Sequence, residues 1–220
     1  MRKPARRPWI ESGTSRSMAL VFACPGKDEL EARRPAAGQT GENLEALLRI
    51  LIDEWGVTQF RRRGEFTITN SWPGVLYDTL TVPPISWVKE EWNLLRLKGE
   101  LSQIEDWIVC FGSAARKAAL ALRTRGWLLP SCQIICGYHP AFGAINRQIK
   151  LDLDDQPIPR QDESPGVTNQ TYLRLEVVAA CLLQQMGLGS NIRLHDGRAW
   201  VSQLSRLSKT HALNQSSSSA

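Results

Sequence analysis

The segment LVFACPGKDELEARRPAAGQTGENL, residues 20–44, begins with an apolar run that stops abruptly at Cys24-Pro25-Gly26. A stretch of small residues follows, and helix-forming residues resume near Glu42. This pattern predicts a buried strand, a sharp turn, and a second glycine-containing turn that leads into a helix. Because α/β folds bind ligands just beyond the carboxyl ends of parallel strands, the first turn is the expected place for chemistry.

The composition is that of an ordinary globular protein. The chain has 220 residues, of which 42 % are hydrophobic and 22 % charged, enough for one domain with a sizeable core. No apolar run approaches the roughly 20 residues that a membrane-spanning helix needs, and no hydrophobic region follows the basic N-terminus as in a signal peptide. We therefore expect a cytoplasmic protein without a membrane partner.

The net charge of +5 is unevenly distributed along the chain. Five basic residues and one acid lie between Met1 and Arg16, and Arg61-Arg62-Arg63 forms a second basic cluster. Such clusters suit a polyphosphate partner, although many short basic runs are simply solvated.

The five cysteines do not form a recognisable framework. Their number is odd, which argues against a set of disulfides in a protein that does not look secreted. Cys132 and Cys136 are four residues apart, but no second pair stands at a zinc-like spacing. We interpret them as strand residues and expect no metal and no cofactor.

Strand and helix signals alternate along the chain. Strands are predicted at 17–23, 66–70, 107–111 and 132–136, and helices at 41–55, 87–104, 114–122 and 171–186, with Ser113 as an N-cap. This order predicts an α/β fold, a three-layer α/β/α sandwich around a central four-stranded parallel sheet, over residues 18–187. The remainder is interpreted as a flexible basic arm (1–17), an exposed insertion (150–168) and a polar tail that is at least partly disordered (188–220).

Polar and small residues end the predicted strands. Cys24-Pro25-Gly26, Asn70, Gly112 and His139 would all lie at the carboxyl edge of the sheet, where ligands gather in such folds.

Four segments of the chain stand in a suggestive order: Ala23-Cys24-Pro25-Gly26, Arg34-Pro35-Ala36-Ala37-Gly38, Ile68-Thr69-Asn70 and His139-Pro140-Ala141. They resemble the GEAPG, GRPFVG, ITN and HPS motifs of the uracil-DNA glycosylase superfamily, most closely its thermophile-type branch. The resemblance covers roughly residues 18–187. It implies an enzyme that flips a nucleotide out of DNA and hydrolyses its N-glycosidic bond, leaving an abasic site. We expect it to act on DNA as a monomer.

The resemblance also assigns roles to particular residues. His139 would donate a hydrogen bond to O2 of the departing base, and Asn70 would read the edge of the flipped pyrimidine. The backbone around Pro25 and Gly26 would lie close to the base. The segment after His139 would enter the minor groove, with apolar wedge residues and a phosphate contact at Phe142, Ile145 and Arg147.

Two further residues are candidates for DNA contacts. Lys27 could meet a phosphate or act as a Schiff-base nucleophile, and it could equally be a solvated side chain. Thr40 lies in Gly38–Gly41, which could hold a phosphate at the helix N-terminus or form a simple loop.

The departures from the family pattern concern the acid that activates water. Ala23 replaces the first-motif glutamate, and Cys24 stands where the best-known branch carries an aspartate. Asp28 and Glu29 are the natural substitutes, and the alternative is that both belong to a solvated turn. The resembled branch also binds an iron–sulfur cluster, but its cysteine positions are not matched here.

Two other departures remove volume near the base. Ala36 replaces the aromatic that stacks on uracil, and Gly26 stands where the best-known branch uses a tyrosine to exclude 5-substituted pyrimidines. The sequence therefore predicts a bulky 5-modified pyrimidine as substrate, for example a modified cytosine of phage DNA. The alternatives are an ordinary uracil or deaminated-base repair glycosylase, a non-catalytic DNA-binding module on the same fold, and a hydrolase of free nucleosides.

Overall fold

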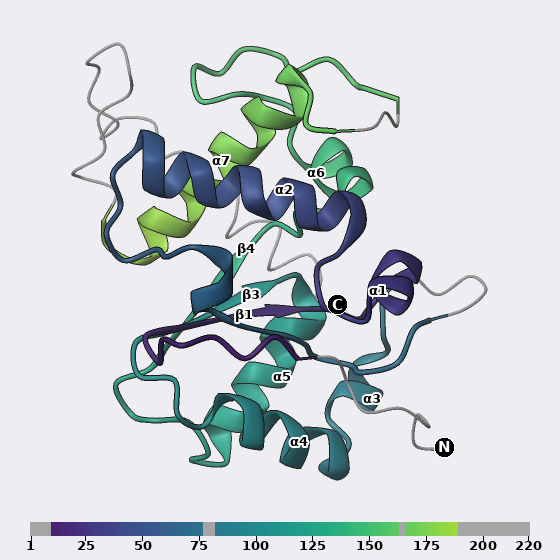
Figure 1. Ribbon diagram of the computed structural model, residues 1–220, viewed down its shortest axis with the longest axis vertical. Coiled ribbons are helices and arrows are strands. Elements are labelled where there is room, and N and C mark those ends of the chain that lie inside the picture. The colour runs from purple at the N-terminus through teal and green to yellow at the C-terminus, as the bar shows by residue number, and fades with distance from the viewer. Residues whose placement is uncertain (1–9, 77–81, 163–165, 189–220) are drawn as a thin grey trace.

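The computed structural model describes residues 10–76, 82–162 and 166–188 (Figure 1). Its centre is a sheet of four parallel strands in the order β2-β1-β3-β4. The strands are β1 (Met18–Phe22), β2 (Thr67–Asn70), β3 (Trp107–Phe111) and β4 (Gln133–Gly137). The predicted fold class is confirmed, and each strand lies within two residues of its predicted range.

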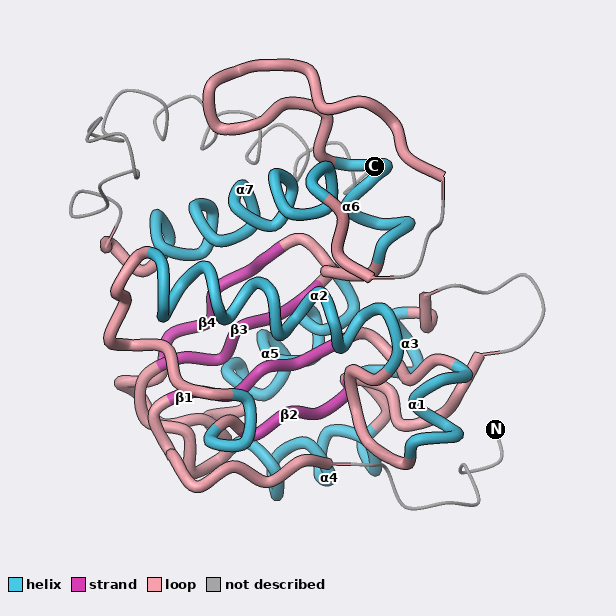
Figure 2. Tube along the Cα trace, turned by 45° about the horizontal axis from the view of Figure 1, so that its top comes forward, coloured by secondary structure: helices cyan, strands magenta, loops and turns pink. Residues whose placement is uncertain are grey.

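Helices cover both faces of the sheet (Figures 1 and 2). One layer contains α2 (Gly38–Arg49), α6 (Phe142–Gln148) and α7 (Asn169–Gln185), and the other contains α3 (Ile85–Val88), α4 (Glu91–Leu101) and α5 (Ser113–Thr124). Strand β1 feeds both cores, because Leu20 and Phe22 pack in the α2–α7 layer and Ala19 and Val21 pack in the α4–α5 layer. A strand buried on both faces is continuously apolar, which is why it could be predicted from sequence.

The helix boundaries differ from the prediction in several places. Helix α2 begins at Gly38 and ends at Arg49, after which one π-helical turn, η1 (Ile50–Glu54), completes the predicted 41–55 helix. A short 3-10 turn, η2 (Arg63–Glu65), precedes β2. The N-cap of α5 is Gly112, one residue before the predicted Ser113.

The predicted helix 87–104 is two helices, α3 and α4, separated at Lys89 and Glu90. Asn93 is fully buried, and its side-chain amide donates to the Val88 carbonyl oxygen at 2.9 Å. This side-chain bond satisfies the last carbonyl of α3 and lets the chain change direction.

The described part of the N-terminal arm is held against the sheet. Glu11 forms an antiparallel bridge with Ile68 at the outer edge of β2, with N–H···O distances of 3.0 and 2.8 Å. Its carboxylate also pairs with the buried Arg63 at 2.9 Å. The prediction of a flexible arm is therefore wrong for residues 10–17, and residues 1–9 lie outside the described residues.

The basic triplet at 61–63 is not a free surface patch. Arg63 is buried and donates to the backbone carbonyls of Pro35 and Ala36, while Arg62 pairs with Asp53 at 2.9 Å. Arg61 is exposed, so the triplet does not present three free basic side chains to a phosphate.

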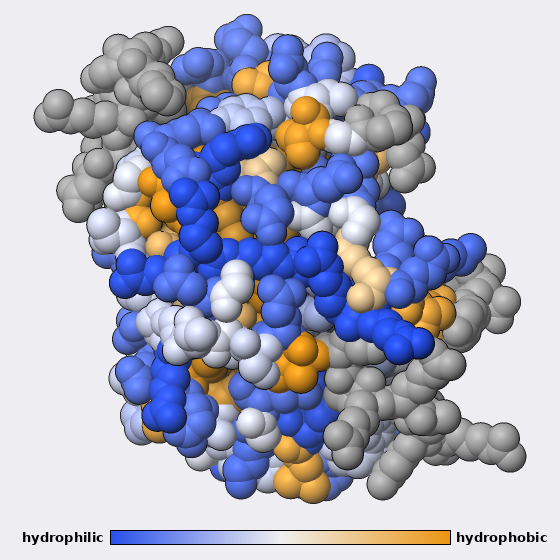
Figure 3. Space-filling model, viewed as in Figure 1, coloured by the Kyte–Doolittle hydropathy of each residue, from blue (hydrophilic) through white to orange (hydrophobic). Residues whose placement is uncertain are grey.

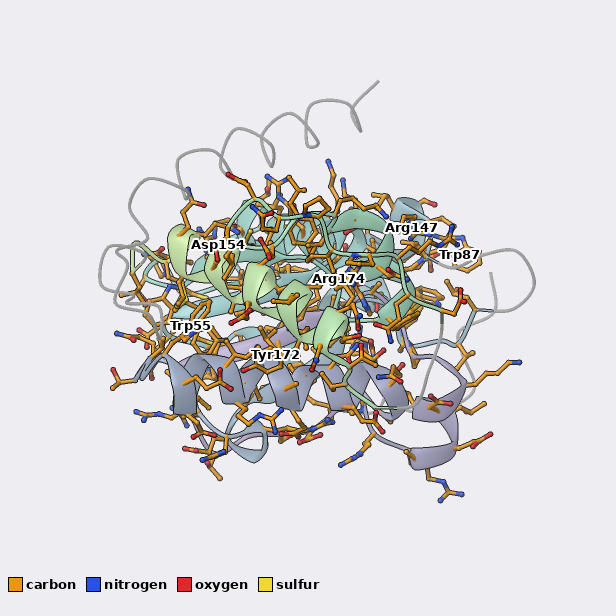
Figure 4. The ribbon with its side chains drawn as sticks, turned by 90° about the horizontal axis from the view of Figure 1, so that it is seen from above. Trp55, Trp87, Arg147, Asp154, Tyr172 and Arg174 are labelled. Atoms are coloured by element: carbon orange, nitrogen blue, oxygen red, sulfur yellow. The ribbon has the colours of Figure 1, made fainter. Side chains whose placement is uncertain are left out.

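The segment 150–168 is partly docked on the domain rather than wholly exposed. Arg174 on α7 is 1 % exposed and donates to the carbonyl oxygens of Ile149, Ile158 and Pro159 (Figure 4). Leu153 and Ile158 are themselves buried in the α2–α7 core. Buried main-chain carbonyls need donors, and this guanidinium supplies them. The predicted tail lies almost entirely outside the described residues, which end at Leu188.

In the described ranges, no helix combines the length and the apolar character required to cross a bilayer.

Candidate functional site

The carboxyl ends of the four strands meet at one end of the molecule, where α1 (Lys27–Ala32), α3 and α6 also lie (Figure 1). The chain passes from β1 to β2 on one side and then crosses to β3 on the other, so the β1/β3 boundary is the topological switch point. Ligands of open α/β sheets bind at such points. As predicted, Cys24-Pro25-Gly26, Asn70, Gly112 and His139 are all at this edge.

Glu29 lies on α1 directly after the β1 turn, and its side chain points inward. The residue is 8 % exposed, its Oε1 accepts the Ala36 N–H at 2.6 Å, and its Oε2 accepts the Gly26 N–H. The carboxylate therefore joins the end of β1 to the loop that leads into α2. The alternative of a solvated turn is wrong for Glu29.

Asn70 ends β2 and meets Glu29. It is 2 % exposed, and its side chain lies beside the Glu29 carboxylate and lowers the pKa of that group. Among the described residues Oδ1 of Asn70 has no hydrogen-bond partner. A buried polar atom without a partner is costly, and it points to a ligand that completes the site.

The environment of Glu29 makes its carboxyl group a weaker acid than usual. Burial raises its pKa, the nearby charge of Asp28 raises it further, and the Gly26 and Ala36 amides together with the Asn70 side chain offset part of this rise. A carboxylate offers about four lone-pair positions, so the two amide donors leave room for a further donor. A base with a raised pKa that can still accept one hydrogen bond is suited to activating water.

His139 follows β4 and is held as a neutral donor. Its Nδ1 accepts the Ala141 N–H at 3.1 Å, which leaves the ring proton on Nε2. The residue is half-buried, and desolvation of its ring lowers the pKa to about 4. At neutral pH this histidine is uncharged and presents one N–H, at Nε2.

Phe22 lies between Asn70 and His139. It lies opposite Asn70 in the β1–β2 register, and its ring meets the His139 ring edge-on at a centroid distance of 5.5 Å. Gly112 ends β3 beside them: a Cβ there would be 4.0 Å from Cδ2 of His139, and its φ of +96° disfavours any side chain.

Two buried networks hold the backbone of these segments, and the sequence analysis did not find them. Arg96 donates to the Asn70 carbonyl oxygen at 2.8 Å and pairs with Glu100, which accepts from Thr69 Oγ1 at 2.7 Å. The i,i+4 spacing of Arg96 and Glu100 was visible in the sequence, but it usually marks an exposed pair.

The second network supports the loop that carries His139. Asn43 is fully buried, and its Nδ2 donates to the Pro140 carbonyl oxygen at 2.6 Å. Its Oδ1 accepts from Gln39, which also donates to the Gly166 carbonyl oxygen. The partners are 97 residues apart in the chain, so no local signal could have found this contact.

Several predicted site residues take other positions. Ile145 is fully buried in the α2–α7 core and cannot act as a wedge in the minor groove without leaving it. Ala36 is also fully buried in that core, so its small side chain does not open the pocket as predicted. Asp28 is exposed and its side chain lies against Gly38, the first residue of α2, where the helix dipole favours a negative charge.

This position of Asp28 also bears on Thr40. Thr40 is half-buried in the first turn of α2, not in a loop before it, and an anionic side chain already lies beside that turn. Repulsion by Asp28 argues against the predicted phosphate contact at Thr40.

The remaining candidates lie at or near the surface of the carboxyl end. Gly26, Lys27 and Arg147 are exposed and Phe142 is half-buried, whereas Pro25 is buried. Figure 4 shows Arg147 on α6 toward the same end as Trp87 on α3. Burial and the charge of Glu29 raise the pKa of Cys24 to about 12, so its thiol is protonated at neutral pH and is no nucleophile.

Within the part of the chain that the structure describes, no three His, Cys, Asp or Glu side chains gather in a way that could hold a metal ion. No family model matches the chain, and no curated protein matches it significantly.

Proposed function

We propose that this protein is a DNA glycosylase that hydrolyses the N-glycosidic bond of a flipped pyrimidine and leaves an abasic site. The observation that carries the proposal is the buried Glu29–Asn70 pair, with its unpartnered Oδ1, on the same sheet edge as a neutral histidine. Two hydrogen-bonding groups for a base and one carboxyl group for water are the parts that such a reaction needs.

The proposed chemistry assigns one step to each group. As the bond from the sugar to the base nitrogen breaks, its electron pair moves onto the base, and Nε2–H of His139 donates to the O2 that becomes negative. A donor of this kind stabilises the transition state more than the ground state. Glu29 orients a water molecule and accepts its proton while the water oxygen bonds to the sugar carbon. Asn70 holds the edge of the base.

DNA would approach the carboxyl end of the sheet. Exposed basic residues stand there on α1, on the loop after it and on α6: Lys27, Arg33, Arg34 and Arg147. The surface around α1 is mainly hydrophilic (Figure 3). Basic side chains at the mouth of the site would bind phosphates and release counterions.

Gly26 supports a base that is larger than uracil. It is exposed, and the nearest atom to a Cβ built there is Oε2 of Glu29 at 3.4 Å. The absence of a side chain thus leaves space directly beside the catalytic carboxylate, where a 5-substituent of a pyrimidine would fit. With Ala36 buried, Gly26 alone carries this part of the proposal. A 5-modified cytosine, such as those in phage DNA, is the proposed substrate.

The test is strand cleavage by alkali after incubation with oligonucleotides that contain uracil, 5-hydroxymethylcytosine or glucosylated 5-hydroxymethylcytosine. The proposal expects cleavage at a 5-modified base and a rate that falls by roughly 100-fold or more in His139→Ala. The exposed Arg49→Ala variant, at the far end of α2, is the matched control. Efficient cleavage at uracil alone would assign the protein to ordinary repair, and tight DNA binding without any cleavage would make it a binding module.

A further inference from the structure

The peptide group between Pro140 and Ala141 is hydrogen-bonded at both of its ends. Its N–H, which belongs to Ala141, donates to Nδ1 of His139 at 3.1 Å. Its carbonyl oxygen, which belongs to Pro140, accepts from Nδ2 of Asn43 at 2.6 Å. Because a peptide group is planar, a donor that fixes the carbonyl oxygen also fixes the direction of the N–H. The side chain of Asn43 is therefore separated from the imidazole ring by a single rigid group.

The hydrogen bonds of Asn43 fix the orientation of its amide. Nε2 of Gln39 donates to the Gly166 carbonyl oxygen at 3.1 Å and to Oδ1 of Asn43 at 3.3 Å. Because carbonyl oxygens only accept hydrogen bonds, this chain of bonds is satisfied only when Nδ2 of Asn43 faces Pro140. Asn43 is fully buried and Pro140 is buried as well, so a reversed amide would leave polar atoms unpaired away from water.

The bond to Nδ1 decides which tautomer of His139 is present. A ring nitrogen that accepts a hydrogen bond carries no proton, so the neutral ring carries its proton on Nε2. A carbonyl that accepts a hydrogen bond also makes the N–H of the same peptide a stronger donor, because hydrogen bonds in a chain polarise one another. Loss of the Asn43 donor would therefore weaken the bond to Nδ1 and allow the peptide and the ring to turn.

We propose that Asn43 is a positioning residue for His139: by fixing the Pro140–Ala141 peptide, it keeps the histidine proton on Nε2 and the ring in place. This inference rests on the proposed function, in which that Nε2–H donates to the departing base. Asn43 does not touch the base in this assignment and acts through one peptide group. Through Gln39 the same chain of bonds reaches Gly166, so the docking of the segment before α7 on α2 also supports the ring.

The first test reads the tautomer and needs no activity. In ¹⁵N-labelled protein, long-range ¹H–¹⁵N spectra distinguish protonated from unprotonated ring nitrogens, and His139→Asn identifies the signals of this ring among the three histidines. At neutral pH the wild type should show a protonated Nε2 and an unprotonated Nδ1. Asn43→Leu keeps the size of the side chain without its donor and should shift both nitrogens toward the average of the two tautomers. A wild-type spectrum in Asn43→Leu, or mixed tautomers in the wild type, would overturn the inference.

The second test separates positioning from binding. At saturating DNA, Asn43→Leu should release the nucleobase about 10- to 100-fold more slowly, because a small misplacement of a catalytic group has an effect of this size. Its affinity for DNA should be unchanged, because a fully buried side chain cannot touch phosphate. Leu48→Ala, which removes buried apolar contacts from the same helix, is the control for lost stability and should keep the rate and the tautomer. An equal loss of rate in both variants would overturn the inference.

Gln39→Ala provides a second variant in case Asn43→Leu does not fold. Gln39 is half-buried, and its loss leaves the Asn43 amide without its orienting donor. A smaller shift of the His139 nitrogens in the same direction is expected, and an unchanged ring spectrum would overturn the inference. If the wild type releases no base at all, the proposed function fails, and the ring spectra alone decide whether Asn43 positions His139.

Discussion

Asp28 and Glu29 are adjacent acids in one short helix, and the fold gives them different surroundings. Neighbouring residues of a helix point about 100° apart, so one side chain faces the site and the other faces solvent and α2. Glu29 is 8 % exposed and holds two loop amides, whereas Asp28 is exposed beside Gly38. Of these two acids, Glu29 is the one whose side chain lies beside Asn70.

This difference predicts opposite outcomes for two conservative substitutions. Glu29→Gln removes the proposed general base. It should lower the rate constant for release of the nucleobase in a single turnover by roughly 100-fold or more. Asp28→Asn, the matched control, should change the rate by no more than a few-fold. Thermal unfolding of both variants distinguishes lost chemistry from lost structure, because a glutamine at 29 can accept only one of the two loop amides. An equal loss of rate in both variants would contradict the assignment of Glu29 as the general base.

His139 predicts a pH dependence of stability. Burial lowers its pKa from 6.5 to about 4, so between these values the unfolded chain binds a proton that the folded protein does not. The stability linked to this group is therefore fully present above pH 6.5, falls as the pH drops toward 4, and is constant below that. His139→Asn removes this contribution. Urea unfolding at several pH values should show that the wild type loses more stability between pH 6.5 and 4 than the variant does; parallel curves would contradict the prediction.

At the scale of secondary structure, the sequence identified the strands better than the helices. The two central strands, β1 and β3, are buried on both faces and read as uninterrupted apolar runs, Leu20–Ala23 and Trp107–Phe111. The break between α3 and α4 depends on where the buried Asn93 side chain finds its acceptors, and α1 is short and mostly exposed. Features that depend on tertiary hydrogen bonds leave no periodic signal in the sequence.

Helix α4 also fixes the end of β2, which gives a prediction about positioning. Arg96 and Glu100 are 12 % and 11 % exposed, so Arg96→Met leaves a buried carboxylate and the Asn70 carbonyl without their partner. We expect the variant to lose about 3 kcal/mol of stability. The double variant Arg96→Met/Glu100→Met removes both charges and should recover most of that loss.

Base release by the double variant tests whether Arg96 has a role beyond stability. The Asn70 carbonyl is still unsupported in this protein, so the rate constant for release should stay well below that of the wild type although the fold is restored. Full recovery of the rate together with stability would make Arg96 a purely structural residue.

At the scale of the whole molecule, the two ends of the sheet have different characters. The predicted positions of Asn70 and His139 at one edge follow from the parallel direction of the strands, which the sequence predicted. Glu29 and Arg96 lie against Asn70, and Asn43 donates to the carbonyl of Pro140 after His139. These three residues come from different helices, and contacts over such separations could not be predicted. The place of Asn70 and His139 at this edge was therefore foreseeable, whereas the hydrogen bonds around them were not.

The difference between the two ends of the sheet also predicts where DNA binds. Lys27, Arg34 and Arg147 are exposed at the carboxyl end, while Arg49 ends α2, about 16 Å along the helix from its first residue. Each phosphate contact adds about 0.9 to the slope of log K against log salt for duplex DNA. The double variant Lys27→Ala/Arg34→Ala should weaken binding and flatten this slope by about 1.8 in fluorescence anisotropy titrations, and Arg49→Ala should change neither. If Arg49→Ala flattened the slope as much, the phosphates would be bound over the whole surface, and the carboxyl end would have no privileged role in bringing a flipped base to Glu29, Asn70 and His139.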